Sequence, residues 1–493
     1  MDVEYEYRQR VRRYATSDLL KYCAKEAIDI YNSTENNVKV EEVPVYSKKN
    51  GMQVTIHQFH IAQWDLLEIC FNSIKYGNDY RNRPIEKHDY YDLLNLTKIR
   101  AELLENPSSL AQEDLHKHLI CIANMEFDLE QITLKNKFNR VHHIMSFINR
   151  NPKYDQSDNI CYIDFSSKFY EITGLNYDTY IICYFMICIF SLVSKESDIM
   201  SILNNLDFDL SVFGISKEEV LNVVSFLAKE YEFYRRYDNW NILKYFPIVK
   251  TKKSSRYIIC NLTALLTCFA ESTYWVIRNY YCNLKSRDFT AYFGHCFEFY
   301  LNELFEAYDI SAMKLPEDKV AKRPDWKLET QSYIFYIEQK SALYPMETRS
   351  IISKKRITSL NNYIDSNIKK GFIQLNSYDE PTDKTIIRIC LTFENIYFPD
   401  IIQDIVLPEI TLKSEDYLNW VVSINEFEKL MFILSKDEDK FNDIITKKIE
   451  LEQTKSKEGR GFDSILKEEK NDFISNKINY FDNYVKKYIK KEK

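Results

Sequence analysis

The stretch from Arg323 to Lys340, RPDWKLETQSYIFYIEQK, constrains this chain more than any other part of its sequence. It holds a Pro-Asp pair, a short polar segment and an apolar run that ends in Glu-x-Lys. Because side chains alternate along a strand, we expect Glu338 and Lys340 on one face and Gln339 on the other. Neither face of the apolar run is polar, which predicts a strand buried inside a sheet with charged groups only at its end.

Length and composition bound the remaining possibilities. At 493 residues the chain can form several domains with hydrophobic cores. A net charge of -7 argues against coating nucleic acid through bulk charge, so such contacts are expected only from local basic patches. The eleven cysteines form no CxxC pair and the first residues lack an apolar signal core, which favours reduced thiols and a cytoplasmic location. The longest apolar run, 180–193, is shorter than the roughly 18 to 20 residues of a membrane span, so we expect a core helix and no membrane contact.

The apolar pattern divides the chain into three parts. Residues 1–285 are mostly helical in pattern, with a hairpin signal at an Asn-Gly turn and the option of two subdomains that meet near 150–165. Residues 286–435 alternate helices with buried strands, which predicts an α/β domain with a mixed central sheet flanked by helices. Residues 436–493 are rich in charge and poor in apolar residues, so we expect a charged tail that is either a solvated helix or partly disordered. The chain has no GxxxxGK[ST] motif, which excludes ATP hydrolysis by a P-loop.

A basic cluster lies between the short apolar runs FPIV and YIICNL. Lys250, Lys252, Lys253 and Arg256 fall in the turn between these runs, which predicts a hairpin with a basic tip. Since a capped helix precedes the hairpin, one interpretation is a winged-helix unit that touches the phosphate backbone of a nucleic acid. The other interpretation is a solvated basic turn. The four cations are therefore candidate nucleic-acid-binding residues.

The charges at the end of the predicted strand suit phosphodiester hydrolysis. This reaction requires neutralisation of the phosphoryl oxygens and a hydroxide near neutral pH, and a divalent cation held by carboxylates provides both. We expect Asp325, Glu338 and the backbone carbonyl of Gln339 to bind Mg2+ or Mn2+, with Lys340 orienting the water and stabilising the transition state. Glu298, beside the apolar stripe of the preceding helix, is expected to bind a metal or to position its water. The alternative is a salt-bridge cluster at the edge of a sheet.

The pattern Pro-Asp, twelve intervening positions and Glu-Gln-Lys, preceded by a helical glutamate, resembles the PD-(D/E)XK nuclease superfamily. The resemblance covers about a third of the chain and implies that Glu298, Asp325, Glu338 and Lys340 are catalytic. Gln374, in the segment QLNSY, is similar to the glutamine of the QxxxY element in the RecB-like branch. There the glutamine approaches the active site, so Gln374 is carried over as a further candidate.

This resemblance implies a Mg2+- or Mn2+-dependent endonuclease that acts on DNA. An RNase on the same fold, or a non-catalytic module for nucleic-acid binding or complex assembly, are the alternatives. A large helical region ahead of a nuclease domain without its own motor is similar to effector subunits of bacterial antiphage systems. That analogy implies a partner ATPase or sensor protein. A homo-oligomer is also expected, since cutting both strands of a duplex commonly takes two active sites.

Overall fold

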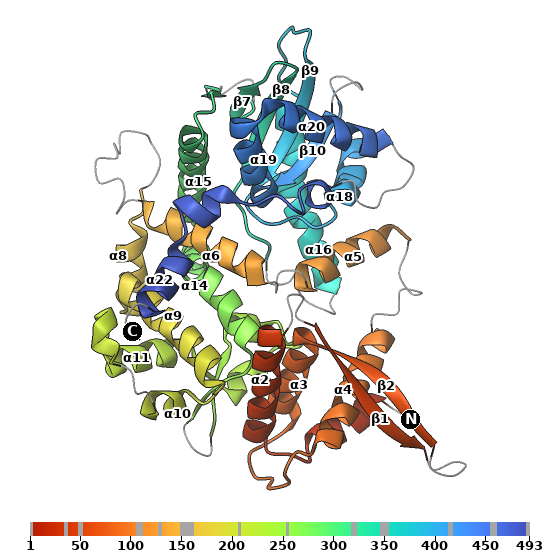
Figure 1. The fold of residues 1–493 in the computed structure, drawn as a ribbon, viewed down its shortest axis with the longest axis vertical. Coiled ribbons are helices and arrows are strands. Elements are labelled where there is room, and N and C mark those ends of the chain that lie inside the picture. The colour runs from red at the N-terminus through yellow and green to blue at the C-terminus, as the bar shows by residue number, and fades with distance from the viewer. Residues whose placement is uncertain are drawn as a thin grey trace.

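A computed structural model describes most of the chain. The described residues are 3–33, 38–47, 53–104, 112–126, 131–147, 162–205, 209–252, 256–316, 323–345, 354–412, 418–453 and 461–489. The helical part, the sheet unit and the last helices follow one another along the sequence (Figure 1).

The part before residue 286 is mostly helical, as predicted. Its helices are α1 (Val3–Val11), α2 (Thr16–Ser33), α3 (Gln63–Tyr76), α4 (Lys87–Leu104), α5 (Gln112–Glu126), α6 (Gln131–Met145), α8 (Phe165–Thr173), α9 (Tyr177–Ser194), α10 (Ile199–Asn204), η3 (Leu210–Phe213), α11 (Lys217–Leu227), α12 (Tyr231–Tyr234), α13 (Ile242–Tyr245) and α14 (Leu262–Asn283). Its strands are β1 (Val38–Ser47), β2 (Gln53–Ala62), β3 (Lys229–Glu230), β4 (Ile248–Lys250) and β5 (Tyr257–Ile259). β1 and β2 form the predicted hairpin, and β3, β4 and β5 form a small sheet.

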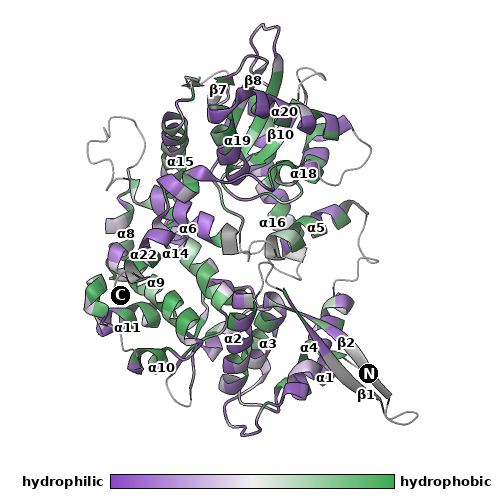
Figure 2. Cartoon of the chain, viewed as in Figure 1, coloured by the Kyte–Doolittle hydropathy of each residue, from purple (hydrophilic) through white to green (hydrophobic). Residues whose placement is uncertain are grey.

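Helix α9 contains the longest apolar run and lies in the core. Asn176 begins it by accepting a hydrogen bond from the backbone N–H of Thr179. Among the described residues, α9 is the one helix with the length and apolarity to span a membrane. However, 61% of that stretch is buried inside the protein, and the helix is apolar around most of its surface (Figure 2). Burial on several sides explains this composition.

The C-terminal part of the chain contains the predicted mixed sheet. Its strands are β6 (Ala312–Lys314), β7 (Trp326–Glu329), β8 (Tyr333–Lys340), β9 (Thr385–Thr392) and β10 (Leu418–Ser423). Its helices up to Lys436 are α15 (Asp288–Ala307), α16 (Lys354–Tyr363), the π-helical segment η5 (Ile364–Lys369), α17 (Lys370–Leu375), α18 (Pro399–Val406), η6 (Leu407–Glu409) and α19 (Ile424–Lys436). The strand order is β10-β9-β8-β7-β6. β8, β9 and β10 are parallel, whereas β7 is antiparallel to both β6 and β8.

The central strand β8 is buried on both faces, which explains its unbroken apolar run. Phe335 and Ile337 belong to the core that includes α15 and α19. Ile334 and Tyr336, on the opposite face, pack in the core that includes Phe372 of α17. The predicted mixed sheet flanked by helices is thus confirmed, although a fold of this kind does not by itself show an activity.

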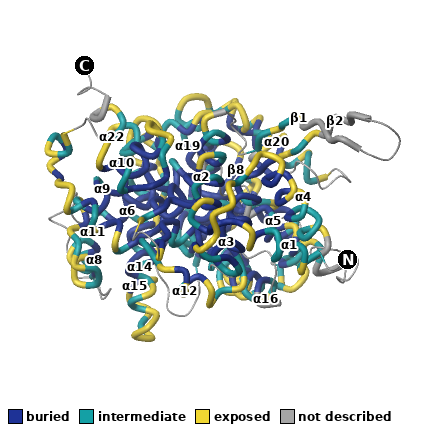
Figure 3. Tube along the Cα trace, turned by 90° about the horizontal axis from the view of Figure 1, so that it is seen from below, coloured by how far each residue is buried: buried dark blue, intermediate teal, exposed yellow. Residues whose placement is uncertain are grey.

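The sheet unit and the helical region share one hydrophobic core. The ring of Tyr274 in α14 lies 5.1 Å from that of Phe289 and 4.9 Å from that of Phe293, both in α15. The same core joins α6, α9 and α14 to the inner face of the sheet. Buried segments therefore run through the interior of the molecule (Figure 3).

The C-terminal helices differ from the expected solvated tail. They are α20 (Glu438–Gln453), α21 (Phe462–Ile465), the π-helical segment η7 (Phe473–Lys477) and α22 (Tyr480–Ile489). Phe441 and Ile445 are buried, because apolar residues recur at helical spacing among many charges. The backbone N–H of Phe481 donates to Oδ1 of Asn139 at 3.0 Å. This bond ties α22 to α6.

Candidate active site

Asp325 and Glu338 face each other across the β7–β8 pair. Trp326 pairs with Ile337 in the antiparallel register, and the same register places Asp325, one residue before β7, opposite Glu338. Directly opposed residues point to one face of a sheet. The backbone N–H of Gln339 donates to Oδ2 of Asp325 at 2.8 Å. Since like charges in opposed positions destabilise a sheet, a proton or a cation beside the two carboxylates would stabilise this pair.

Both carboxylates are perturbed by burial. Burial raises the pKa of Asp325, although the Gln339 N–H and Lys340 oppose this change. Burial and then repulsion from Asp325 raise the pKa of Glu338 to about 8. Glu338 is 2% exposed, and its Oε2 atom is buried without a hydrogen-bond donor from the described residues. A buried oxygen of this kind, beside a second carboxylate, fits the ligand set of a hard divalent ion.

Lys340 lies next to the carboxylate pair. Its ammonium donates to Oε1 of Glu338 at 2.6 Å and to Oε1 of Gln374 at 3.2 Å. Burial disfavours the charged ammonium, but Glu338 outweighs this effect and the pKa of Lys340 is raised. The amine is therefore a fixed positive charge at neutral pH. The structure brings Asp325, Glu338, Lys340 and Gln374 together.

The helix that carries Gln374 closely approaches the sheet. α16, η5 and α17 are contiguous, and π-helical segments are frequent at functional sites. A Cβ atom at Gly371 would lie 2.8 Å from Sγ of Cys390 and 3.3 Å from Cε of Lys340. A larger residue here would require the Cys390 side chain or the helix to shift. Gly371 therefore allows Gln374, one turn later, to reach the lysine.

Gln339 points away from the carboxylates, as the strand alternation predicts. Its side chain accepts a hydrogen bond from Nε1 of Trp326 at 3.1 Å and donates to the carbonyl of Gly294 in α15 at 3.4 Å. Both contacts lie on the α15 face of β8. The predicted role of the Gln339 carbonyl as a metal ligand stays a prediction.

Glu298 lies at the margin of the site. It projects from α15 and forms an ion pair with Lys314 of β6. Burial is the largest cause of the raised pKa of Asp325, and the negative charge of Glu298 raises this pKa further. Within the described ranges, no three His, Cys, Asp or Glu side chains are grouped to hold a metal ion. The candidate centre therefore consists of two carboxylates, which suits an ion such as Mg2+ that keeps several waters.

Two neighbours of the site were not selected from the sequence. Arg323 immediately precedes the Pro-Asp pair, and its guanidinium lies 5.7 Å from the ring centroid of Tyr378. That ring packs edge-on against Tyr336 at 5.3 Å, two residues before Glu338 on the same face. Cys390 pairs with Glu338 in the β8–β9 register, and burial raises the pKa of its thiol to about 12. The sequence places the cation Arg323 directly before the Pro-Asp pair, and this could have identified it as a site neighbour. No local sequence pattern distinguishes Cys390.

Strands β4 and β5, which flank the basic turn, pair antiparallel as predicted. The described cations of the basic turn are each paired with a carboxylate. Lys250 contacts Glu230 at 3.1 Å, Lys252 contacts Glu232, and Arg256 contacts Asp198 at 3.3 Å. Lys253 lies outside the described residues. Glu230, Glu232 and Asp198 thus neutralise much of the charge proposed for phosphate binding.

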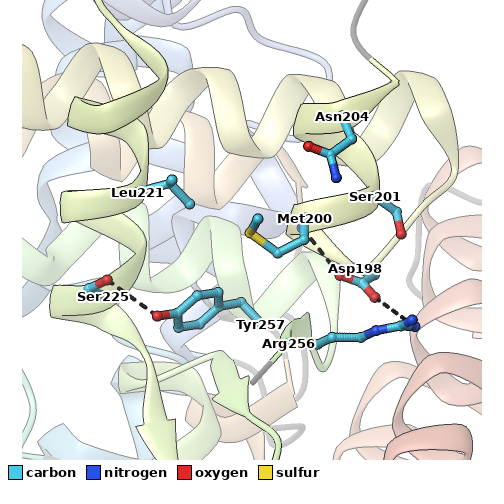
Figure 4. Close-up of a pocket in the computed structure, with 8 residues that line it drawn as sticks. All are labelled: Asp198, Met200, Ser201, Asn204, Leu221, Ser225, Arg256 and Tyr257. Carbon is cyan, nitrogen blue, oxygen red and sulfur yellow. Dashed lines mark hydrogen bonds and ion pairs between the residues drawn. The ribbon is translucent and has the colours of Figure 1, made fainter. Parts of the chain in front are cut away.

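A cavity of about 590 Å³ lies beside this hairpin, between α10, α11 and β5 (Figure 4). Arg256 covers the buried Asp198 at one end, and the Tyr257 hydroxyl lies 3.4 Å from that of Ser225 at the other. None of its lining residues belongs to the carboxylate pair. The cavity is therefore separate from the candidate active site.

Comparison of the chain with protein-family models, with curated proteins and with solved structures gave no match.

Proposed function

We propose that the chain is a divalent-metal-dependent endonuclease that hydrolyses DNA phosphodiester bonds. The observation that supports this proposal is the opposed, buried pair of Asp325 and Glu338. The ammonium of Lys340 lies 2.6 Å from Oε1 of Glu338. A pair of this kind is costly in an unliganded sheet. Strongly perturbed buried carboxylates beside a specific charge partner favour a functional site.

Asp325 and Glu338 would hold Mg2+ or Mn2+, which when bound supplies positive charge to the phosphoryl oxygens and lowers the pKa of water. The residues of the chain perform the other tasks. Glu338 gives up its proton before it acts as a ligand. Lys340 remains charged and offers its N–H groups to a nucleophilic water or a phosphoryl oxygen. The side-chain oxygen of Gln374 accepts a hydrogen bond from the ammonium and holds it in place.

The biological setting is proposed from architecture alone. A large helical region ahead of the sheet unit supports the proposal that the chain is the effector of a bacterial antiphage system. Such an effector would have a partner ATPase or sensor and a cytoplasmic location. RNA on the same site, and a non-catalytic binding module, are the other outcomes of a substrate test.

The test is cleavage of supercoiled plasmid, single-stranded DNA and RNA with Mg2+, Mn2+ or EDTA. We expect the wild type to cut DNA with either metal, and Glu338→Gln and Lys340→Met to lose at least about a hundredfold in rate. Glu329→Gln is the matched control, because Glu329 lies at the far end of β7 and pairs with Lys384. Equal cutting by all four proteins would exclude this site. Metal binding without cleavage of any nucleic acid would favour the non-catalytic module.

A further inference from the structure

Helix α6 inserts three basic side chains into the sheet unit. Lys137, Arg140 and His143 lie three residues apart and are all buried. They contact Glu394 at 2.5 Å, Glu428 at 2.6 Å and Glu303 at 2.7 Å, respectively. Each carboxylate is at least 160 residues away in sequence. A helix of the N-terminal region is thus bonded electrostatically to the unit that carries the candidate active site.

Lys137 differs from Arg140 and His143 because its partner Glu394 also contacts the segment that follows β8. Its ammonium lies between two buried carboxylates, Glu271 of α14 at 2.6 Å and Glu394 just after β9 at 2.5 Å. Glu394 is fully buried, and its Oε2 accepts the backbone N–H of Tyr344 at 3.1 Å. Tyr344 lies in the segment that leaves β8 four residues after Lys340. One carboxylate therefore joins α6 to the chain that follows the catalytic strand.

The same carboxylate lies beside the end of β8 itself. Thr392 is the register partner of Lys340, and the backbone N–H of Phe393 donates to the Lys340 carbonyl at 2.8 Å. Glu394 is the next residue. The exits of β8 and β9 are thus held together by the Phe393 bond and by the Glu394 carboxylate, whose charge is neutralised by Lys137. Movement of Lys137 would remove this neutralising charge from Glu394, which lies beside the strand end that carries the Lys340 ammonium.

Arg140 provides the contrast. Its guanidinium makes two hydrogen bonds to Glu428 of α19, at 2.7 Å and 2.6 Å. Glu428 also accepts from the Tyr300 hydroxyl and from Asn471. None of these groups belongs to β8 or to its exit. The Arg140 pair therefore joins helix to helix, whereas the Lys137 pair reaches the site.

We propose that Lys137 is a positioning residue of the proposed nuclease and that α6 transmits the state of the helical region to Lys340 through Glu394 and Tyr344. The expected effect on metal binding rests on the proposed function, whereas the contacts that link Lys137 to the end of β8 do not. A partner that shifts α6 would loosen or tighten the end of β8, and with it the metal site. Mutation of the hydrogen-bonding groups that orient metal ligands commonly changes metal affinity or activity by about 10- to 100-fold.

The experiment compares full-length Lys137→Met, Lys137→Arg and Arg140→Met with the wild type. Hydrogen exchange of the 341–345 segment is followed by mass spectrometry, and Mn2+ affinity by calorimetry. In Lys137→Met we expect exchange in 341–345 to be roughly tenfold faster and Mn2+ binding to be about tenfold weaker. Lys137→Arg keeps the charge and should retain near-wild-type values. Arg140→Met, which breaks an equally buried pair, should destabilise the protein without a selective change in 341–345.

Unchanged exchange in Lys137→Met, or equal increases in Lys137→Met and Arg140→Met, would overturn the proposal. If Lys137→Met does not fold, Glu394→Met replaces it, since this change removes the acceptor of the Tyr344 N–H while Lys137 keeps its pair with Glu271. This variant is expected to show the same local increase in exchange. Faster exchange in a protein whose wild type binds no Mn2+ would support the α6 linkage and overturn the proposed nuclease function.

Discussion

Without metal, the carboxylate pair should make the protein less stable as the pH rises from 6 to 8. The pKa of Glu338 is about 8 in the folded protein against an ordinary value of 4.5. Between these values the folded chain binds a proton that the unfolded chain has lost, so the free energy of unfolding falls with rising pH. Integration from pH 6 to pH 8 gives a loss of about 2 kcal/mol from this one group. For a chain of this length that unfolds as one unit, the loss corresponds to about 2 °C in Tm.

The measurement is Tm in EDTA across this range for wild type, Glu338→Gln and Glu329→Gln. Glu338→Gln lacks the titrating group, so its Tm should fall less steeply with pH than that of the wild type. Glu329 is a suitable control because its hydrogen bond to Lys384 lowers its pKa, which keeps its titration below this range. With saturating Mn2+ the wild-type slope should flatten, since the ion binds the ionised pair and the folded chain then holds no extra proton at Glu338. Parallel slopes for wild type and Glu338→Gln in EDTA would refute the reasoning.

Three further predictions concern the surroundings of the site. Gly371→Ala should cost about 1 to 3 kcal/mol and weaken Mn2+ binding, because the new Cβ meets Cys390, and the double variant with Cys390→Ala should recover part of both losses in denaturation and calorimetry. Arg323→Ala should raise the KM for DNA by about tenfold with a smaller effect on kcat, as expected if its guanidinium binds a substrate phosphate. Arg256→Ala should lower Tm, because Asp198 loses a partner, and should leave the DNA affinity unchanged; a large loss of affinity in a filter-binding assay would restore the basic turn as a nucleic-acid contact.

The sequence by itself determined the local features of the site. The alternation along 333–340 places Glu338 and Lys340 on one face, and the unbroken apolar run requires a strand covered on both sides. The spacing to Asp325 is compatible with an antiparallel neighbour. These properties depend on residues close together in the chain, so periodicity and motif spacing are sufficient to predict them.

Only the tertiary structure decided the partners of these groups. Glu298 pairs with Lys314, and the cations of the basic turn meet acids from a preceding segment. Charged helices after residue 436 pack because their few apolar residues find a complementary surface. Lys137 reaches Glu394 across 257 positions. Such contacts depend on which surfaces meet when the chain folds, and no local pattern in a single sequence encodes that choice.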